Sequence, residues 1–211
     1  MEITIIGTGN MARGIGTRAV AGGHDVTLLG TEQAHAEELA AELDGSSVKA
    51  GTVGDPIAGD VVVLAVWYPV SREVVERYGD QLDGKVVVDI TNPLDVDAFE
   101  PIVPEAGSAA QELAAAAPNA KVVKAFNTTF AGTLAGGGKV AGQPLDVFIA
   151  SDDEDAKRTV GRLVEDAGLR AVDAGPLRRA RELEALGYLH MGVQEPLGTG
   201  FSSAVKVVSE S

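Results

Sequence analysis

Short apolar segments recur along the chain and alternate with longer segments of helical pattern. Runs that are apolar at successive positions are typical of strands buried on both faces of a parallel sheet. The predicted strands are 3–6, 25–29, 61–66, 86–90, 122–126 and 147–150, and the predicted helices are 11–21, 32–43, 71–78, 109–116 and 154–167. Glycine or proline stands at nearly every junction. This alternation predicts an α/β fold built on a doubly wound parallel sheet with right-handed crossovers.

The pattern is less regular after Phe126. Residues 127–142 are rich in glycine and polar residues, one more strand–helix–strand unit covers 145–173, and a helical pattern extends to about Tyr188. Residues 202–208 alternate enough to predict a final edge strand. We therefore expect a main domain over residues 1–142 and a small C-terminal α/β lobe over residues 143–211.

Composition narrows the class of protein. Hydrophobic residues make up 45% of the 211 residues and charged residues 23%, values that fit a globular protein and argue against disorder. The absence of cysteine excludes disulfide scaffolds, cysteine-ligated metals and thiol catalysis. The three histidines are widely separated, so we expect no metal site.

Charge and the N-terminus bear on partners and location. The net charge of −14 disfavours nonspecific binding to nucleic acid or to an anionic membrane. Glu2 stands where a secretory leader needs a basic residue, and no segment approaches about 18 consecutive apolar residues. We expect a cytoplasmic protein without a membrane span, in which any anionic ligand is held by a local feature.

A glycine-rich loop at the end of the first predicted strand supplies such a feature. Gly7, Thr8, Gly9, Asn10, Met11 and Ala12 form a G-x-G-x-x-A pattern between a strand and a helix. The first glycine permits a tight turn, the second lets a pyrophosphate approach the backbone, and the alanine permits close helix packing. Free N–H groups and the helix dipole attract the anion without a basic side chain. The motif predicts a Rossmann-like domain that binds a dinucleotide.

The tip of the second predicted strand bears on the choice between NAD and NADP. An acid at this tip binds the ribose 2′-hydroxyl of NAD and repels the 2′-phosphate of NADP. Here Gly30 is followed by Thr31, with Glu32 one step later, which favours NADP. Glu32 equally fits a solvated first-turn residue or a ribose ligand. His35 stands one helical turn further on and can approach a 2′-phosphate, or lie exposed on the helix surface.

Four segments together resemble the NADPH-dependent coenzyme F420 reductase family, to which the NADPH-binding domain of the STEAP metalloreductases is related. They are Gly7–Met11, Asp89–Leu94 (DITNPL), Val123–Thr128 (VKAFNT) and Asp173–Leu177 (DAGPL). The resemblance implies a Rossmann-like fold, NADP(H) as cofactor, coenzyme F420 as co-substrate and a homodimer. The family's NADP-recognition pair is Ser or Thr followed by Arg, and in this chain only Thr31 matches it.

Hydride transfer between a nicotinamide and a flavin-like ring depends on positioning and demands no acid–base pair. Residues at the carboxyl ends of the strands are expected to line the pocket. After three predicted strands these residues are Val66, Trp67, Tyr68 and Pro69; Thr91, Asn92 and Pro93; and Asn127 and Thr128. The aromatic rings can wall the nicotinamide, and the asparagines can bond its carboxamide or the acceptor. The same segments also fit a packed loop, a turn and a helix cap.

Arg178, Arg179 and Arg181 form the densest basic cluster in this acidic chain. They can hold the phosphate and glutamyl tail of coenzyme F420, or form a solvated helix face that pairs with Glu182 and Glu184. The leading interpretation is an oxidoreductase that moves hydride between NADP(H) and coenzyme F420. The alternatives are an NADPH-dependent flavin or ferric reductase of the same fold, and a dinucleotide-sensing protein without turnover.

Overall fold

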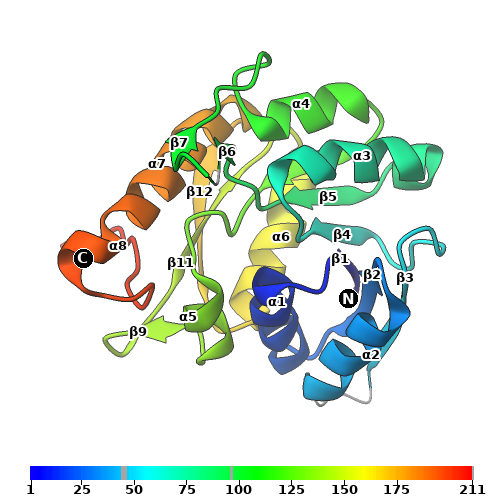
Figure 1. Ribbon diagram of the computed structural model, residues 1–211, viewed down its shortest axis with the longest axis horizontal. Helices are drawn as coiled ribbons and strands as arrows, with labels where there is room; N and C mark the ends of the chain where they lie inside the picture. The colour runs from blue at the N-terminus through cyan, green and yellow to red at the C-terminus, as the bar shows by residue number, and fades with distance from the viewer. Residues whose placement is uncertain (44–46, 96, 211) are drawn as a thin grey trace.

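The computed structural model describes residues 1–43, 47–95 and 97–210. Its centre is an eight-stranded sheet with the order β12-β11-β8-β5-β4-β1-β2-β3 (Figure 1). The strands are β1 (Glu2–Ile6), β2 (Asp25–Gly30), β3 (Val48–Thr52), β4 (Val61–Leu64), β5 (Val86–Asp89), β8 (Lys121–Lys124), β11 (Asp146–Ala150) and β12 (Arg170–Gly175). The six strands from β3 to β8 are parallel to one another. The predicted α/β, Rossmann-like sheet is confirmed.

Helices cover both faces of the sheet (Figure 1). They are α1 (Asn10–Ala21), α2 (Gln33–Glu42), α3 (Tyr68–Tyr78), α4 (Ala109–Ala116), α5 (Ala131–Ala135), α6 (Glu154–Asp166), α7 (Ala180–Gly192) and α8 (Gln194–Leu197), with 3-10 turns η1 (Gly79–Leu82) and η2 (Leu177–Arg179). Two short hairpins complete the fold, β6 (Leu94–Asp95) with β7 (Glu100–Pro101) and β9 (Lys139–Val140) with β10 (Gln143–Pro144).

Alternate residues of the central strands feed two separate cores, because successive side chains of a strand point to opposite faces. Ile3, Ile5 and Val63 pack with residues of α1, α2, α5 and α6 on one face. Ile6 and Leu64 pack with residues of α3, α4 and the start of α7 on the other. The central strands are therefore buried on both sides, as their continuous apolar runs predicted.

The last two strands differ from the rest of the sheet. β11 and β12 are parallel to each other, but β11 meets β8 in an antiparallel pair at Ala150 and Lys124. The sheet is thus mostly parallel. Strands β11 and β12 extend the same sheet as the first six strands. The division of the chain into two domains at residue 142 remains a prediction.

Two edge features were predicted incorrectly. Residues 202–208 form no strand; this segment is held instead by Lys206 and by the backbone N–H of Val207, both of which bond Asp146. The edge strand β3 was missed. It is only partly buried, and its sequence VKAGT lacks the apolar run of a central strand. Among the described residues, no helix is long and apolar enough to span a bilayer.

Candidate functional site

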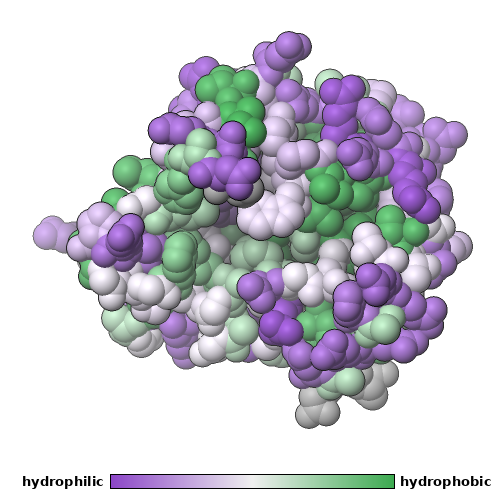
Figure 2. Space-filling view, viewed as in Figure 1, coloured by the Kyte–Doolittle hydropathy of each residue, from purple (hydrophilic) through white to green (hydrophobic). Residues whose placement is uncertain are grey.

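A cavity of about 480 Å³ opens at the carboxyl ends of β1, β4, β5 and β8. The lining residues follow these four strands, apart from Met191 on α7; they are Gly9, Asn10, Met11, Ala65, Val66, Trp67, Tyr68, Ile90, Thr91, Asn92, Leu94, Asn127, Thr129, Phe130, Ala131 and Met191. Strand order reverses between β1 and β4, the place where doubly wound folds bind ligands. Figure 2 shows hydrophobic and weakly polar surface across the middle of one face, with hydrophilic residues above and below.

The glycine loop at the end of β1 has the geometry of an anion cradle. Gly7 has φ of 120°, and a Cβ there would lie 2.3 Å from the backbone oxygen of Ala65. Gly9 has an ordinary extended backbone, and a Cβ there would meet nothing within 4 Å. Space around Gly9 is therefore open toward the cavity. Among the described residues, no acceptor bonds the N–H groups of Asn10 and Met11 in the first turn of α1.

The residues around this loop support its shape. Ala12 lies in the first turn of α1 and is fully buried. A Cβ on Gly30 would lie 2.9 Å from Cγ2 of Thr8, so the end of β2 passes close to the loop. The open space and the free N–H groups fit a dinucleotide pyrophosphate.

The segment after β2 is solvent-exposed. Thr31, Glu32 and His35 are all exposed, and none of them lines the cavity. Glu32 stands at the N-cap of α2 without a side-chain capping bond. Within the described part of the chain, no basic side chain bonds Thr31 or Glu32.

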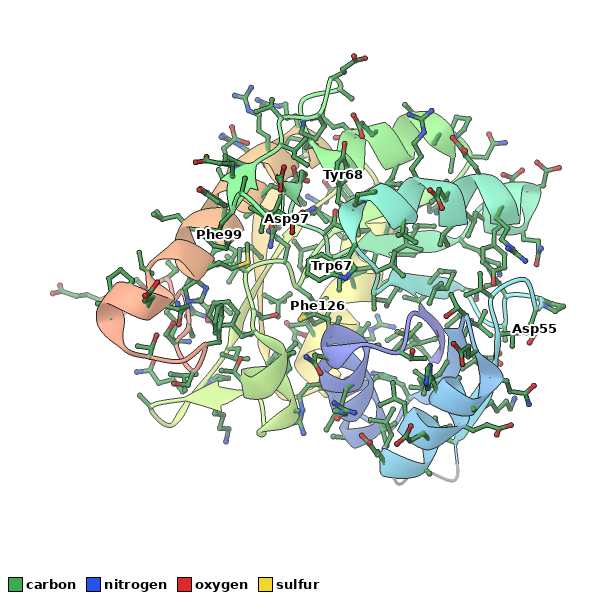
Figure 3. All side chains as sticks on the ribbon, in the orientation of Figure 1. Asp55, Trp67, Tyr68, Asp97, Phe99 and Phe126 are labelled. Atoms are coloured by element: carbon green, nitrogen blue, oxygen red, sulfur yellow. The ribbon has the colours of Figure 1, made fainter. Side chains whose placement is uncertain are left out.

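The junction of β4 and α3 forms one wall of the cavity. Trp67 is the N-cap of α3 and is 68% exposed at the rim, beside Tyr68 in Figure 3. The Tyr68 hydroxyl donates a hydrogen bond of 2.8 Å to Oε2 of Glu112 on α4. Burial and this bond raise the pKa of Tyr68 to about 12, so the phenol stays protonated. Pro69 is exposed in the first turn of α3 and does not line the cavity.

The loops after β5 and β8 meet through their asparagines. Asn127 Nδ2 donates to Asn92 Oδ1 at 2.9 Å and to the Leu183 carbonyl at 2.7 Å, and Asn92 Nδ2 donates to the Asn127 carbonyl at 2.9 Å. Phe126 precedes this pair with φ of 62°, a left-handed conformation that is unusual for a bulky residue. Pro93 and Thr128 are buried behind the cavity rather than in its wall.

Two polar atoms in this region have no partner within the described residues. They are Oγ1 of Thr91 and Oδ1 of Asn127, which belong to side chains that are 3% and 5% exposed. Both residues line the cavity. Buried polar atoms are normally hydrogen-bonded, so these two oxygens have unused hydrogen-bonding capacity beside the cavity.

Thr128 and Phe130 connect the β8 loop to α7. The Thr128 carbonyl accepts from His190 Nδ1 at 3.2 Å, so the proton is on that nitrogen, and Nε2 lies 2.8 Å from the Ser203 hydroxyl. Burial lowers the pKa of His190, and a neutral ring fits this arrangement. Phe130 stacks on the imidazole with ring centroids 4.3 Å apart and also lines the cavity.

The arginine cluster lies away from the cavity. Arg178, Arg179 and Arg181 are exposed in η2 and the first turn of α7, where Arg179 and Arg181 pair with Glu182. Met191, which does line the cavity, is ten residues beyond Arg181, or about 15 Å along the helix axis.

The sequence analysis did not predict that Asp89, Lys124 and Glu184 form a buried charged group next to the cavity. In one alternative, Glu184 was expected to pair with the arginine cluster on a solvated helix face, and this was wrong because its side chain is buried against Lys124. Lys124 is fully buried, 2.7 Å from Oδ2 of Asp89 and 2.8 Å from Oε1 of Glu184. Lys124 interrupts the apolar run VVKAF, and this pattern is the feature that could have identified it. Thr91 lines the cavity as expected, whereas the sequence analysis missed the lining residues Thr129, Phe130 and Met191.

The chain is similar to several known proteins. Residues 2–93 match the family model of the coenzyme F420-dependent NADP oxidoreductases. The F420-dependent NADP reductase of Methanothermobacter thermautotrophicus is 30% identical over an alignment 209 residues long. That alignment covers 88% of this chain and 86% of that protein. Metalloreductase STEAP3 of Rattus norvegicus is 30% identical over 185 residues, or 88% of this chain but only 36% of that protein.

A solved structure extends the likeness to three dimensions. The crystal structure of a putative F420-dependent NADP reductase from Arthrobacter sp. FB24 superposes with a TM-score of 0.86 at 26% identity, and covers 98% of this chain and 99% of that one. From the glycine loop, the parallel sheet and these relatives together, it follows that the chain belongs to the F420-dependent NADP oxidoreductase family.

Proposed function

We propose that this protein transfers hydride between NADP(H) and the deazaflavin coenzyme F420. The observation that carries the proposal is the pair of buried, unpartnered oxygens at Thr91 and Asn127, in a cavity that begins at the glycine loop. A nicotinamide carboxamide offers both a donor and an acceptor, which suits these two atoms. Family membership supports the same cofactor.

The residues of the cavity have separate tasks in binding. The free N–H groups of Asn10 and Met11 would hold the pyrophosphate at the start of α1. Asn127 Oδ1 would accept a hydrogen bond from the carboxamide, because its own Nδ2 is already committed to Asn92 and Leu183. Trp67 offers an exposed ring at the rim on which a second planar ring can stack.

When bound, the nicotinamide supplies the hydride. The protein's contribution is orientation and the exclusion of water. Among the described residues that line the cavity, none carries a formal charge, and Tyr68 stays a neutral phenol. With such a lining, the protein promotes hydride transfer by positioning the two stacked rings. We also propose that the protein is a cytoplasmic homodimer.

The anionic tail of the acceptor needs a positive surface on a protein of charge −14. Arg178, Arg179 and Arg181 stay the proposed contact, although they lie at the opposite end of α7 from Met191. A tail that reaches them would have to run along α7 outside the cavity.

A second candidate, NADPH-dependent reduction of a free flavin or a ferric chelate, is favoured by the uncharged lining and by the likeness to STEAP3. The test incubates the purified protein with NADPH and either coenzyme F420 or riboflavin plus a ferric chelate. The proposal expects rapid loss of the deazaflavin absorbance and slow flavin turnover. Faster turnover of flavin supports the second candidate, and no turnover with tight NADPH binding supports a sensor.

A further inference from the structure

The buried charges of Asp89, Lys124 and Glu184, named here the Lys124 cluster, tie together the ends of β5, β8 and α7. The Lys124 ammonium donates to Asp89 Oδ2 at 2.7 Å, to Glu184 Oε1 at 2.8 Å and to the Thr91 carbonyl at 2.5 Å. Asp89 Oδ1 accepts from the Thr91 N–H at 2.9 Å. Both backbone groups of Thr91, a residue of the cavity wall, are therefore held by the cluster.

Glu184 extends the cluster to a second helix. Its carboxylate accepts from the N–H of Ala109 at 3.2 Å, in the first turn of α4. The same helix carries Glu112, the partner of the Tyr68 hydroxyl at the junction of β4 and α3. Burial raises the pKa of Glu184 above its ordinary value, while the Lys124 ammonium opposes this effect.

The position of α7 matters because this helix touches the cavity floor. A Cβ on Gly187 would lie 2.5 Å from Asn92 Oδ1 and 2.9 Å from the Asn127 carbonyl. Helix α7 is thus in direct contact with both asparagines, and one turn further it contributes Met191 to the wall. A shift of this helix by a fraction of an ångström would move the asparagines or open the floor.

Stability alone gives little reason for such a cluster. Replacement of a buried ion cluster by neutral side chains of similar volume is often neutral or stabilising, because the charges must be desolvated. What this cluster does provide is geometry, since it fixes Thr91 and α7 relative to each other.

We propose that Lys124 is a positioning residue for the nicotinamide ring, acting through the Thr91 carbonyl and through Glu184 on α7. The inference rests on the proposed function in one respect, that the cavity receives a nicotinamide; it does not depend on which acceptor is used.

The test is a neutral variant, Asp89→Asn/Lys124→Met/Glu184→Gln. The new amides keep an oxygen acceptor for the N–H groups of Thr91 and Ala109, and the Thr91 carbonyl loses its ammonium donor. The matched control is Asp146→Asn/Arg170→Met/Lys206→Met. It removes another fully buried carboxylate and its two cations, at the edge of the sheet and outside the cavity.

Two ligands separate positioning from a general structural role: NADPH, and 2′-phospho-ADP-ribose, which lacks the nicotinamide. The neutral variant is expected to bind NADPH at least fivefold more weakly and the fragment within twofold of the parent, and to transfer hydride about 10- to 100-fold more slowly in a single turnover. The control variant should stay within twofold of the parent in its affinity for NADPH, its affinity for the fragment and its single-turnover rate. Equal changes for both ligands, or no change, overturn the inference.

Two further results keep the test decisive. If thermal unfolding shows that the neutral variant does not fold, Glu184→Gln is measured in the same way, since it leaves the Lys124–Asp89 pair intact. A loss of NADPH affinity at least threefold greater than the loss for the fragment supports the inference, and a smaller difference overturns it. Failure of the parent protein to bind NADPH would instead contradict the proposed function.

Discussion

Asn92 and Asn127 bond each other reciprocally at 2.9 Å, the first from the loop after β5 and the second from the loop after β8. Asn127 Nδ2 donates both of its hydrogens, one to Asn92 Oδ1 and one to the Leu183 carbonyl, and Asn127 Oδ1 has no partner among the described residues. The Asn127 side chain thereby joins the loops after β5 and β8 and keeps an unused acceptor beside the cavity.

Gly7 and Gly9 should respond in opposite ways to substitution. Gly7→Ala places a Cβ against the Ala65 carbonyl at a strained φ, and should lower the free energy of unfolding by about 1–3 kcal/mol. Gly9→Val has open space and an ordinary φ, so the free energy of unfolding should change by no more than about 1 kcal/mol while NADPH binding is lost. Urea unfolding and NADPH titration measure both. NADPH affinity equal to the parent in Gly9→Val would refute the pyrophosphate assignment.

Thr91→Val tests the unpartnered hydroxyl. The variant keeps the shape of the side chain and both backbone bonds, so the protein without ligand should be as stable as the parent or more stable by up to about 1 kcal/mol. NADPH affinity should fall about three- to tenfold. The control is Thr4→Val, which removes a bonded buried hydroxyl, and should lower stability without a change in NADPH affinity. A Thr91→Val protein that binds NADPH like the parent would show that this oxygen faces no ligand.

Cofactor choice depends on the segment after β2. NADPH should be preferred to NADH, and Thr31→Asp should reverse the order, because a carboxylate at the strand tip repels the 2′-phosphate. Comparison of kcat/KM for the two nucleotides decides the matter. A parent protein that favours NADH would make Glu32 the ribose-binding candidate.

Replacement of Arg178, Arg179 and Arg181 by Gln tests the proposed tail contact. The KM for coenzyme F420 should rise severalfold, and the KM for NADPH should stay near the parental value, because these residues lie outside the cavity. Turnover of a neutral free flavin serves as the control and should be nearly unchanged. An unaltered KM for F420 would assign the cluster to a solvated face that pairs with Glu182.

Local sequence patterns predicted the parts of this molecule that depend on local physics. The apolar runs identified β1, β2, β4, β5, β8 and β11, and the glycine spacing identified the loop at Gly7 and Gly9. Two predicted strands, 61–66 and 122–126, extended two residues past the observed ends of β4 and β8. Ala65 and Phe126 are apolar and buried, yet the chain turns away there to form the cavity wall.

Features that depend on contacts distant in the sequence were not predictable from one chain. The pairing of Lys124 with Glu184 joins residues 60 apart, and the contact of Gly187 with Asn92 depends on how α7 crosses the sheet. Residues 202–208 alternate like a strand, but Asp146 captures the end of that segment through side-chain and backbone bonds instead. Periodicity reports which side of an element is buried, and it contains no information on which partner buries it.

The most direct test of the central claim follows the hydride itself. The protein is incubated for a single turnover with NADPH that carries deuterium at one of the two C4 positions, coenzyme F420 is added, and the reduced deazaflavin is analysed by mass spectrometry. Direct transfer in a fixed cavity predicts one deuterium in the product from one C4 epimer and none from the other. Reduced F420 without deuterium from either epimer, or no reduced F420 at all, would contradict the account.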